Sequence, residues 1–307
     1  MRLPDSPRFL FVTGKGGVGK TTVAAATSLA LAKSGKRVLL TTSGPKERLS
    51  DLFGVAPLGT EIGLIRERLW AVRITSEVAL REYGSMILKS RTVYKAVFEN
   101  RYVRSFFNAV PGLNEWAVLG KAWFHSIEGL DEGKPRFDVV LFDAPATGHG
   151  LDMLRVPKVI VDVVPPGVLR RDAERAWSMF QDSGQSGVIV VAMPEDMPTN
   201  ETIELIDALR SELFLPISKL VVNQIVPSLF DEHERALLLR PRNLDRKQPG
   251  DEAIASGVRR AIRERIQAES LVRLDALGVE SIRLPLMFGQ ADTPAFVEQL
   301  AREHFTD

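Results

Sequence analysis

The residues of this chain that could carry chemistry begin at position 14, where the sequence reads GKGGVGKTT through position 22. The spacing G-x4-G-K-T is typical of a loop whose backbone N–H groups converge on a chain of phosphates. In such a loop Lys20 neutralises the β- and γ-phosphates, and the Thr21 hydroxyl joins the coordination shell of Mg²⁺. We therefore predict a magnesium–nucleotide site formed by Gly14, Lys15, Gly16, Gly17, Val18, Gly19, Lys20, Thr21 and Thr22.

A carboxylate that could complete this site stands at Asp143, directly after the apolar run Val139–Phe142. A buried strand that ends in an aspartate is the arrangement that holds magnesium through water in phosphate-loop enzymes. We expect Thr21 and Asp143 to hold the metal. Lys15 is surplus to the loop, because N–H groups, Lys20 and the metal already compensate the phosphates; on the residues alone, a solvated loop lysine is the alternative reading.

The elements that must position these residues alternate between short apolar runs and long helical patterns, which is typical of a parallel sheet covered by helices. We expect a helix over about 21–34 and one doubly wound α/β domain over residues 1–307. Residues 76–134 contain no strand pattern and predict an inserted helical lobe. The expected strands are Phe9–Thr13, Arg37–Thr42, Trp70–Ile74, Phe137–Phe142, Val188–Met193, Leu220–Asn223 and Ser281–Leu284.

The composition excludes several classes of protein. The 307 residues have a formal net charge of +1, which gives no reason to expect a nucleic acid or a membrane as the main partner. With no cysteine, the chain can form no disulfide, thiolate zinc site or cysteine-ligated cluster. The N-terminus lacks a signal-peptide pattern, and no run of about 18 apolar residues occurs. We expect a cytoplasmic protein without an integral membrane segment or nucleic-acid partner.

Four segments together resemble the ArsA family, which contains the arsenite-pump ATPase and the factor that delivers tail-anchored membrane proteins. Residues Asp143–Leu151, DAPATGHGL, are similar to its second switch, usually D-x-A-P-T-G-H-T-L. Pro45–Phe53 is similar to its first switch, Pro111–Glu115 to its P-G-I-D-E helix start, and Val222–Gln224 to its adenine-side V-N-Q. The loop at Gly14 resembles the deviant form of the MinD, ParA, nitrogenase iron protein and ArsA group.

This resemblance implies a three-layered P-loop NTPase fold and an ATPase that works as a homodimer or as a heterodimer with a related subunit. Lys15 would reach the nucleotide of the facing subunit, so Lys15, Lys20 and Asp143 are expected to act in catalysis. The segment Val222–Gln224 lacks the N-K-x-D or T-K-x-D element of guanine-specific relatives, which favours ATP. The residues implied to lie around the adenine are Asn223, Pro285 and Leu286.

The chain departs from the family pattern in its first switch. The family reads D-P-A-H there, and its aspartate orients the attacking water, whereas this chain has Gly44 at that position. A glycine cannot polarise water, and positioning the nucleophile is a large part of phosphoryl-transfer catalysis. We expect slow or partner-dependent hydrolysis. Among the nearby polar residues, Asp51 is expected to cap or pack its own short helix.

Because this chain has no cysteine, it lacks the cysteines that bind the metalloid in the arsenite pump and those that clamp the dimer through zinc in the targeting factors. Arsenite transport is therefore not expected. In targeting members the helical lobe forms a hydrophobic client groove, which makes a hydrophobic protein client a possible partner. The stripe Tyr94, Phe98, Tyr102 and Phe106 could line such a groove, but ordinary core is the commoner role of a stripe at helical spacing.

Two further functions stay open at this stage. Gly44 is also compatible with an ATP-gated regulatory subunit or pseudo-ATPase in a heteromer. The other is a ParA- or MinD-like positioning ATPase. MinD-type membrane binding needs a basic amphipathic C-terminal helix, whereas the helix starting at Thr293-Pro294 is mostly acidic and is expected to dock on the sheet. The arginines between Arg259 and Arg265 are expected to form the solvated face of a helix.

Overall fold

The computed structural model describes residues 7–44, 47–88, 112–129, 133, 135–145, 149–240, 243, 245, 248–287 and 293–305. Within these residues, eight strands form one sheet in the order β3-β4-β2-β5-β1-β6-β7-β8. Neighbouring strands are parallel, except that β3 and β4 pair antiparallel. The strands are β1 Phe9–Gly14, β2 Val38–Thr42, β3 Gly63–Arg66, β4 Leu69–Arg73, β5 Val139–Asp143, β6 Ser186–Ala192, β7 Ile217–Ile225 and β8 Ser281–Pro285.

All seven strands expected from the sequence are present, and β3 is the one that sequence analysis missed. It has only four residues, two of them exposed at its start, so its apolar pattern is too short to stand out. The sheet is doubly wound about β1. From β1 the chain builds β2 and β4 on one side, and after β5 has entered between β1 and β2, it adds β6, β7 and β8 on the other.

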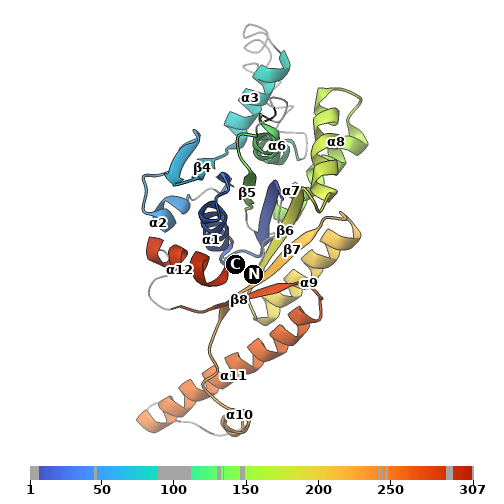
Figure 1. Ribbon diagram of the computed structural model, residues 1–307. Coiled ribbons are helices and arrows are strands. Elements are labelled where there is room, and N and C mark those ends of the chain that lie inside the picture. Colours follow the sequence, from blue (N-terminus) through green and yellow to red (C-terminus); the bar gives the residue numbers. More distant parts are fainter. Residues whose placement is uncertain are drawn as a thin grey trace.

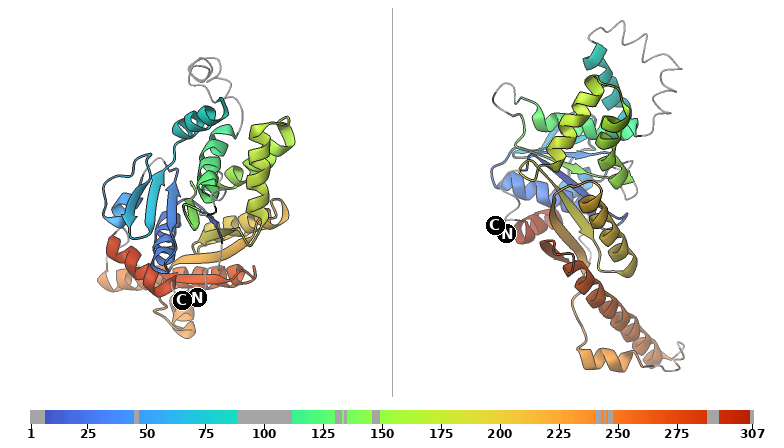
Figure 2. Two further views of the ribbon diagram at one scale, coloured as in Figure 1. Left: turned by 45° about the horizontal axis from the view of Figure 1, so that its top comes forward. Right: turned by 90° about the vertical axis from the view of Figure 1, so that its right-hand side faces the viewer.

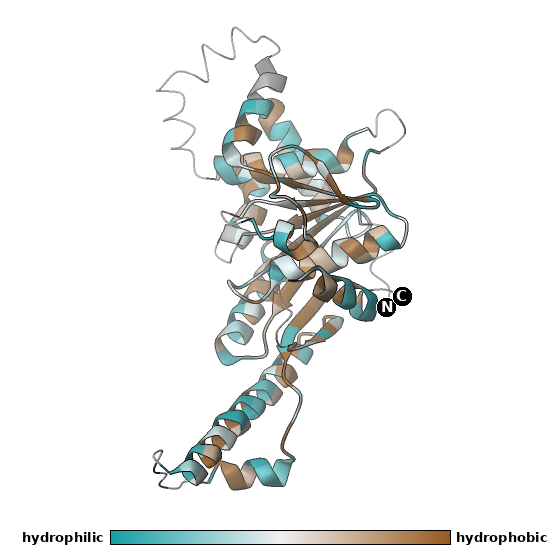
Figure 3. Ribbon diagram, turned by 90° about the vertical axis from the view of Figure 1, so that its left-hand side faces the viewer, coloured by the Kyte–Doolittle hydropathy of each residue, from teal (hydrophilic) through white to brown (hydrophobic). Residues whose placement is uncertain are grey.

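The sheet has a hydrophobic core on each face, because successive side chains of a strand point to opposite faces. On one face Leu10 and Val12 of β1 pack with α1 (Lys20–Lys33), α2 (Leu49–Phe53) and α12 (Pro294–His304). On the other face Phe9 and Phe11 pack with α6 (Leu113–Ile127), α7 (His149–Val163), α8 (Val168–Gln181) and α9 (Asp196–Ser211). Figure 1 shows the sheet between these helices, and Figure 3 shows that its strands are largely hydrophobic. The expected three-layered α/β architecture is confirmed.

The inserted region contributes α3 (Ser76–Leu88) and α6 to the described structure, so both described ends of the predicted helical lobe are helical. They pack against each other, and α6 also joins the main core through Trp116, Leu119 and Trp123. Helix α6 is therefore part of the layer that covers the sheet as well as part of the insertion. The aromatic stripe from Tyr94 to Phe106 lies outside the described residues.

Between β7 and β8 the chain forms an arm of two helices, α10 (Glu232–Leu238) and α11 (Pro249–Asp275), which extends away from the sheet in Figures 1 and 2. Buried Glu264 of α11 joins the two sides of this arm, since it accepts a hydrogen bond from the Leu229 N–H (2.8 Å) in the segment before α10; it also accepts one from Arg260 Nε (2.7 Å) on its own helix. Although burial alone raises the pKa of Glu264, these hydrogen bonds lower it to about 2. The expectation of a solvated arginine face is thus wrong for Arg260, because its guanidinium pairs with buried Glu264 inside the arm.

Candidate active site

The loop between β1 and α1 has the backbone that converging N–H groups require. Gly14 and Gly19 have φ of 145° and 94°, where side chains are disfavoured. Space excludes a side chain as well: a Cβ on Gly14 would lie 2.1 Å from the Val191 carbonyl oxygen, and one on Gly19 would lie 2.3 Å from Asn223 Nδ2. The loop is therefore packed tightly against the ends of β6 and β7, with its backbone facing the cavity described below.

Lys20 opens α1 and is buried, with 8% of its surface exposed. Its ammonium folds back across the loop, where Nζ donates to the carbonyl oxygens of Gly14 (3.0 Å) and Lys15 (2.8 Å). Burial lowers the pKa of Lys20, and the nearby charge of Asp143 opposes that shift. The loop thus holds one ammonium at its centre, where it would meet the phosphates.

Asp143 ends β5 and lies between the ends of β1 and β2, opposite Val12 and Thr42 in the two registers. Its Oδ2 accepts a hydrogen bond from the Thr21 hydroxyl at 2.8 Å. Burial raises the pKa of Asp143 to about 6, against the hydrogen bond from Thr21, the charge of Lys20 and an interaction with the Thr42 hydroxyl, all of which lower it. Its Oδ1 is buried and has no hydrogen-bond partner in the described part of the chain.

These residues fit a magnesium ion. Mg²⁺ prefers hard oxygen ligands and commonly binds through one or two protein oxygens plus phosphates and water. Thr21 Oγ1 and the free Oδ1 of Asp143 supply such oxygens, and a cation there would compensate a buried carboxylate. No cluster of three or more His, Cys, Asp or Glu side chains that could hold a metal ion occurs among the described residues.

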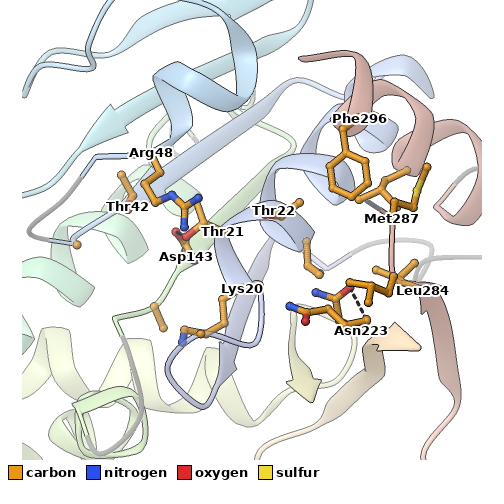
Figure 4. A pocket seen from close by; sticks show the side chains of 18 of the residues that line it. Lys20, Thr21, Thr22, Thr42, Arg48, Asp143, Asn223, Leu284, Met287 and Phe296 are labelled. Carbon is orange, nitrogen blue, oxygen red and sulfur yellow. Dashed lines mark hydrogen bonds between the residues drawn. The ribbon is translucent and has the colours of Figure 1, made fainter. Parts of the chain in front are cut away.

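A cavity of about 440 Å³ runs along this loop, and its two ends differ in chemistry (Figure 4). One end is apolar and lies beside Asn223. The other end carries Lys20, Thr21, Asp143 and Arg48. The apolar end is formed by Leu284, Pro285, Leu286, Met287, Phe296 and Leu300. An apolar end for a flat base and a charged end for phosphates match the two parts of a nucleotide.

Most of the predicted site residues meet at this cavity. The nine that line it are Gly17, Gly19, Lys20, Thr21, Thr22, Asp143, Asn223, Pro285 and Leu286. Four predicted loop residues do not line it, namely Gly14, Lys15, Gly16 and Val18. The Val18 side chain is buried in the core, while its carbonyl oxygen accepts a hydrogen bond from Asn223 Nδ2 at 2.8 Å. Asn223 also accepts from the Gln224 N–H at 2.9 Å, so its amide joins β7 to the loop.

Sequence analysis missed several lining residues, above all Thr42, Arg48, Phe296 and Leu300. Thr42 had a usable signal, because it ends a strand that a parallel sheet brings beside Asp143. For Phe296 and Leu300 the sequence held no signal of a place at the cavity, because their spacing indicates only the apolar side of α12. That side is buried beside α1, as expected for a docked last helix.

Lys15 does not line the cavity and forms an ion pair with Glu201 of α9 in the same chain. The two side chains keep 27% and 35% of their surface exposed. Ion pairs this exposed contribute about 0–1 kcal/mol. Lys15 is therefore held outside its own nucleotide cavity by a contact that a stronger anion could replace.

In the first switch, Gly44 lines the cavity, and Asp143 is the one carboxylate among the described lining residues. The capping role expected for Asp51 is wrong. Glu47 does this instead, since its carboxylate accepts from the Ser50 N–H (2.9 Å) and the Leu58 N–H (3.3 Å), while Asp51 is exposed. Glu47 is thereby engaged in holding α2.

Comparison with known proteins finds relatives that are named as ATPases. The family model for anion-transporting ATPases, ArsA ATPase, matches residues 7–165. The chain is 28% identical to ATPase BagA of Mycobacterium tuberculosis, over 95% of this chain and 91% of that protein. It is 30% identical to a putative arsenical pump-driving ATPase of Halobacterium salinarum, over 76% of this chain and 38% of that protein. It is 25% identical to ATPase GET3 of Kluyveromyces lactis, over 73% of this chain and 74% of that protein.

Proposed function

This chain belongs to the ArsA family of anion-transporting ATPases, and from that premise we propose that it is a cytoplasmic, ATP-switched dimer of single-domain subunits. The observation that carries the proposal is the pair formed by Thr21 and Asp143 beside the Lys20 loop. Asp143 Oδ1 is a buried oxygen without a partner in the described structure, and Mg²⁺ with ATP would satisfy it. When bound, the metal would neutralise charge on the phosphates.

Lys15 is the residue that links nucleotide to dimer in this proposal. Its ion pair with Glu201 is partly exposed and weak, so the phosphates of a nucleotide on a facing subunit would compete well for the ammonium. Closure would then bias the first switch and the helical lobe between open and closed arrangements.

Hydrolysis should be slow in the isolated subunit. Gly44 lines the cavity without a side chain, and Glu47 is engaged in capping α2. Asp143 would hold the metal, and the described lining has no other carboxylate that could orient water. The same observation favours the second candidate, a regulatory subunit whose related partner supplies the missing aspartate.

A ParA- or MinD-like positioning role is less well supported. Its lipid-binding variant needs a helix with a free apolar side. In α12 that side, Phe296, Val297, Leu300 and Ala301, is buried beside α1. In the part of the chain that the structure describes, no helix combines the length and apolar character needed to cross a bilayer.

The hydrophobic-client part of the proposal depends mainly on residues outside the described structure. Within it, the lobe has a cavity of about 110 Å³ between α3, α6 and α8, lined by Tyr83, Trp116 and Phe124. Ligand pockets usually measure about 300–1,000 Å³. This cavity is thus smaller than a usual ligand pocket, and a pull-down from native lysate with and without ATP tests for a client.

Two experiments test the ATPase proposal. Gly44→Asp should raise the rate of ATP hydrolysis by the purified protein, and equal rates for the two proteins would contradict the assignment of Gly44. Sedimentation with Mg²⁺ and a non-hydrolysable ATP analogue should show a dimer that Lys15→Ala weakens and Glu201→Gln strengthens. Lys33→Ala, an exposed lysine at the end of α1, is the matched control. A Lys15→Ala dimer as stable as the wild type would refute the proposed role of Lys15.

A further inference from the structure

Arg48 is a cavity-lining charge that neither the loop motif nor the switch motifs assign. It precedes α2 and lines the nucleotide cavity. In Figure 4 its side chain extends toward Thr21 and Asp143, at the end of the cavity farthest from Met287 and Phe296. Its position in the cavity thus identifies which part of a bound nucleotide it would meet.

The orientation of the nucleotide follows from the lining. The apolar end beside Asn223 suits a base, and the Lys20 loop holds the phosphates at the start of α1. The phosphate chain then runs toward Thr21 and Asp143. A diphosphate ends near the loop, whereas a triphosphate extends one group further, to the end where Arg48 lies. This step rests on the proposed function.

A terminal phosphate would meet the charged side chains at that end of the cavity and could compete for the Arg48 guanidinium. Among the described lining residues, Lys20 and Arg48 are cationic and Asp143 is the only anion. Mg²⁺ held by Asp143 and Thr21 would raise the positive charge further. A guanidinium offers five N–H donors in a planar fork and matches phosphate oxygens in pairs. The terminal phosphate is the part of the nucleotide that this charge would bind.

The base of the Arg48 side chain is held firmly. Its carbonyl oxygen accepts from the Leu52 N–H at 3.2 Å, and Leu49, Leu52 and Phe53 anchor α2 in the core. A side chain on an anchored helix start has less freedom to lose on binding than one on a free loop. The first switch therefore presents a cation to the cavity at Arg48 and no carboxylate at Gly44.

We propose that Arg48 binds the terminal phosphate of ATP and makes the site prefer ATP over ADP. A guanidinium has hydrogen-bond donors and no acceptor, so it does not replace the aspartate that the family has at the position of Gly44. Arg48 would hold the γ-phosphate and the first switch together, and the nucleotide state would be read at α2.

Binding of ADP and of a non-hydrolysable ATP analogue, each with Mg²⁺, tests this by calorimetry. Arg48→Ala should weaken the analogue about ten- to hundredfold, the worth of a charge-assisted hydrogen bond, and leave ADP affinity unchanged. Arg48→Lys should keep part of the preference, because it retains the charge but not the fork. Arg265→Ala, an exposed arginine of α11, is the control and should bind both nucleotides as the wild type does.

Equal weakening of both nucleotides in Arg48→Ala, or no change in either, would overturn the inference. Urea unfolding of each variant separates lost binding from lost folding, and Arg48→Lys decides the matter should the alanine variant unfold. If the wild-type protein binds both nucleotides and Arg48→Ala binds each with the wild-type affinity, only the role of Arg48 is refuted, and the proposed function stands. A wild-type protein that binds neither nucleotide refutes the proposed function, and the inference falls with it.

Discussion

Asp143 gives the sharpest stability test of the site, because its charge is buried beside Thr21 and Lys20. Burial raises its pKa from 3.8 to about 6 in the folded protein. The folded chain therefore keeps this proton over a pH range in which the unfolded chain has released it. Stability from this group is fully present below about pH 4 and is lost as the pH rises through about 6.

The shift corresponds to about 3 kcal/mol of lost stability above pH 7, and to roughly half of that at pH 5. Asp143→Asn removes the charge. Without metal or nucleotide, we expect this variant to gain stability relative to the wild type as the pH rises, by about 1.4 kcal/mol between pH 5 and pH 8. A buried asparagine N–H₂ adds a cost, but that cost does not change with pH.

Urea unfolding of both proteins at pH 5 and pH 8, in buffer with a chelator, measures this difference. Asp51→Asn, which alters an exposed carboxylate of α2, is the matched control. A stability difference between Asp143→Asn and the wild type that is the same at both pH values would refute the reasoning, and so would one that grows toward pH 5. Mg²⁺ and ATP should stabilise the wild type and largely fail to stabilise Asp143→Asn.

Two further predictions concern the loop and the arm. Gly19→Ala places a Cβ against Asn223 at a φ of 94°, so urea unfolding should show a loss of about 1–3 kcal/mol, and ATP binding should weaken; wild-type stability would contradict the close contact. Glu264→Gln removes the charged partner of Arg260 and should cost about 1–3 kcal/mol at pH 7. Because the pKa of Glu264 is lowered to about 2, its contribution is present above about pH 4.5 and is lost as the pH falls through about 2, so the two proteins should converge in acid; a constant difference would contradict this.

Patterns among neighbouring residues in the sequence were enough to predict most of the strands, the phosphate loop and the parallel sheet. The glycine spacing of the loop and the apolar run before Asp143 depend on near neighbours in the chain, so their patterns are visible without a structure. The parallel order follows because helices separate most of the strands. Sequence analysis missed strand β3 because its four residues, two of them exposed, are too few to show a clear periodicity.

Only the tertiary structure decided which distant residues share the site. Arg48 and Phe296 line one cavity although 248 positions separate them, because α2 and α12 pack on the same face of the sheet. Lys15 pairs with Glu201, and no spacing in the sequence relates the two. Contacts of this kind depend on how elements cross in space, which side-chain packing across the whole core determines and local pattern does not.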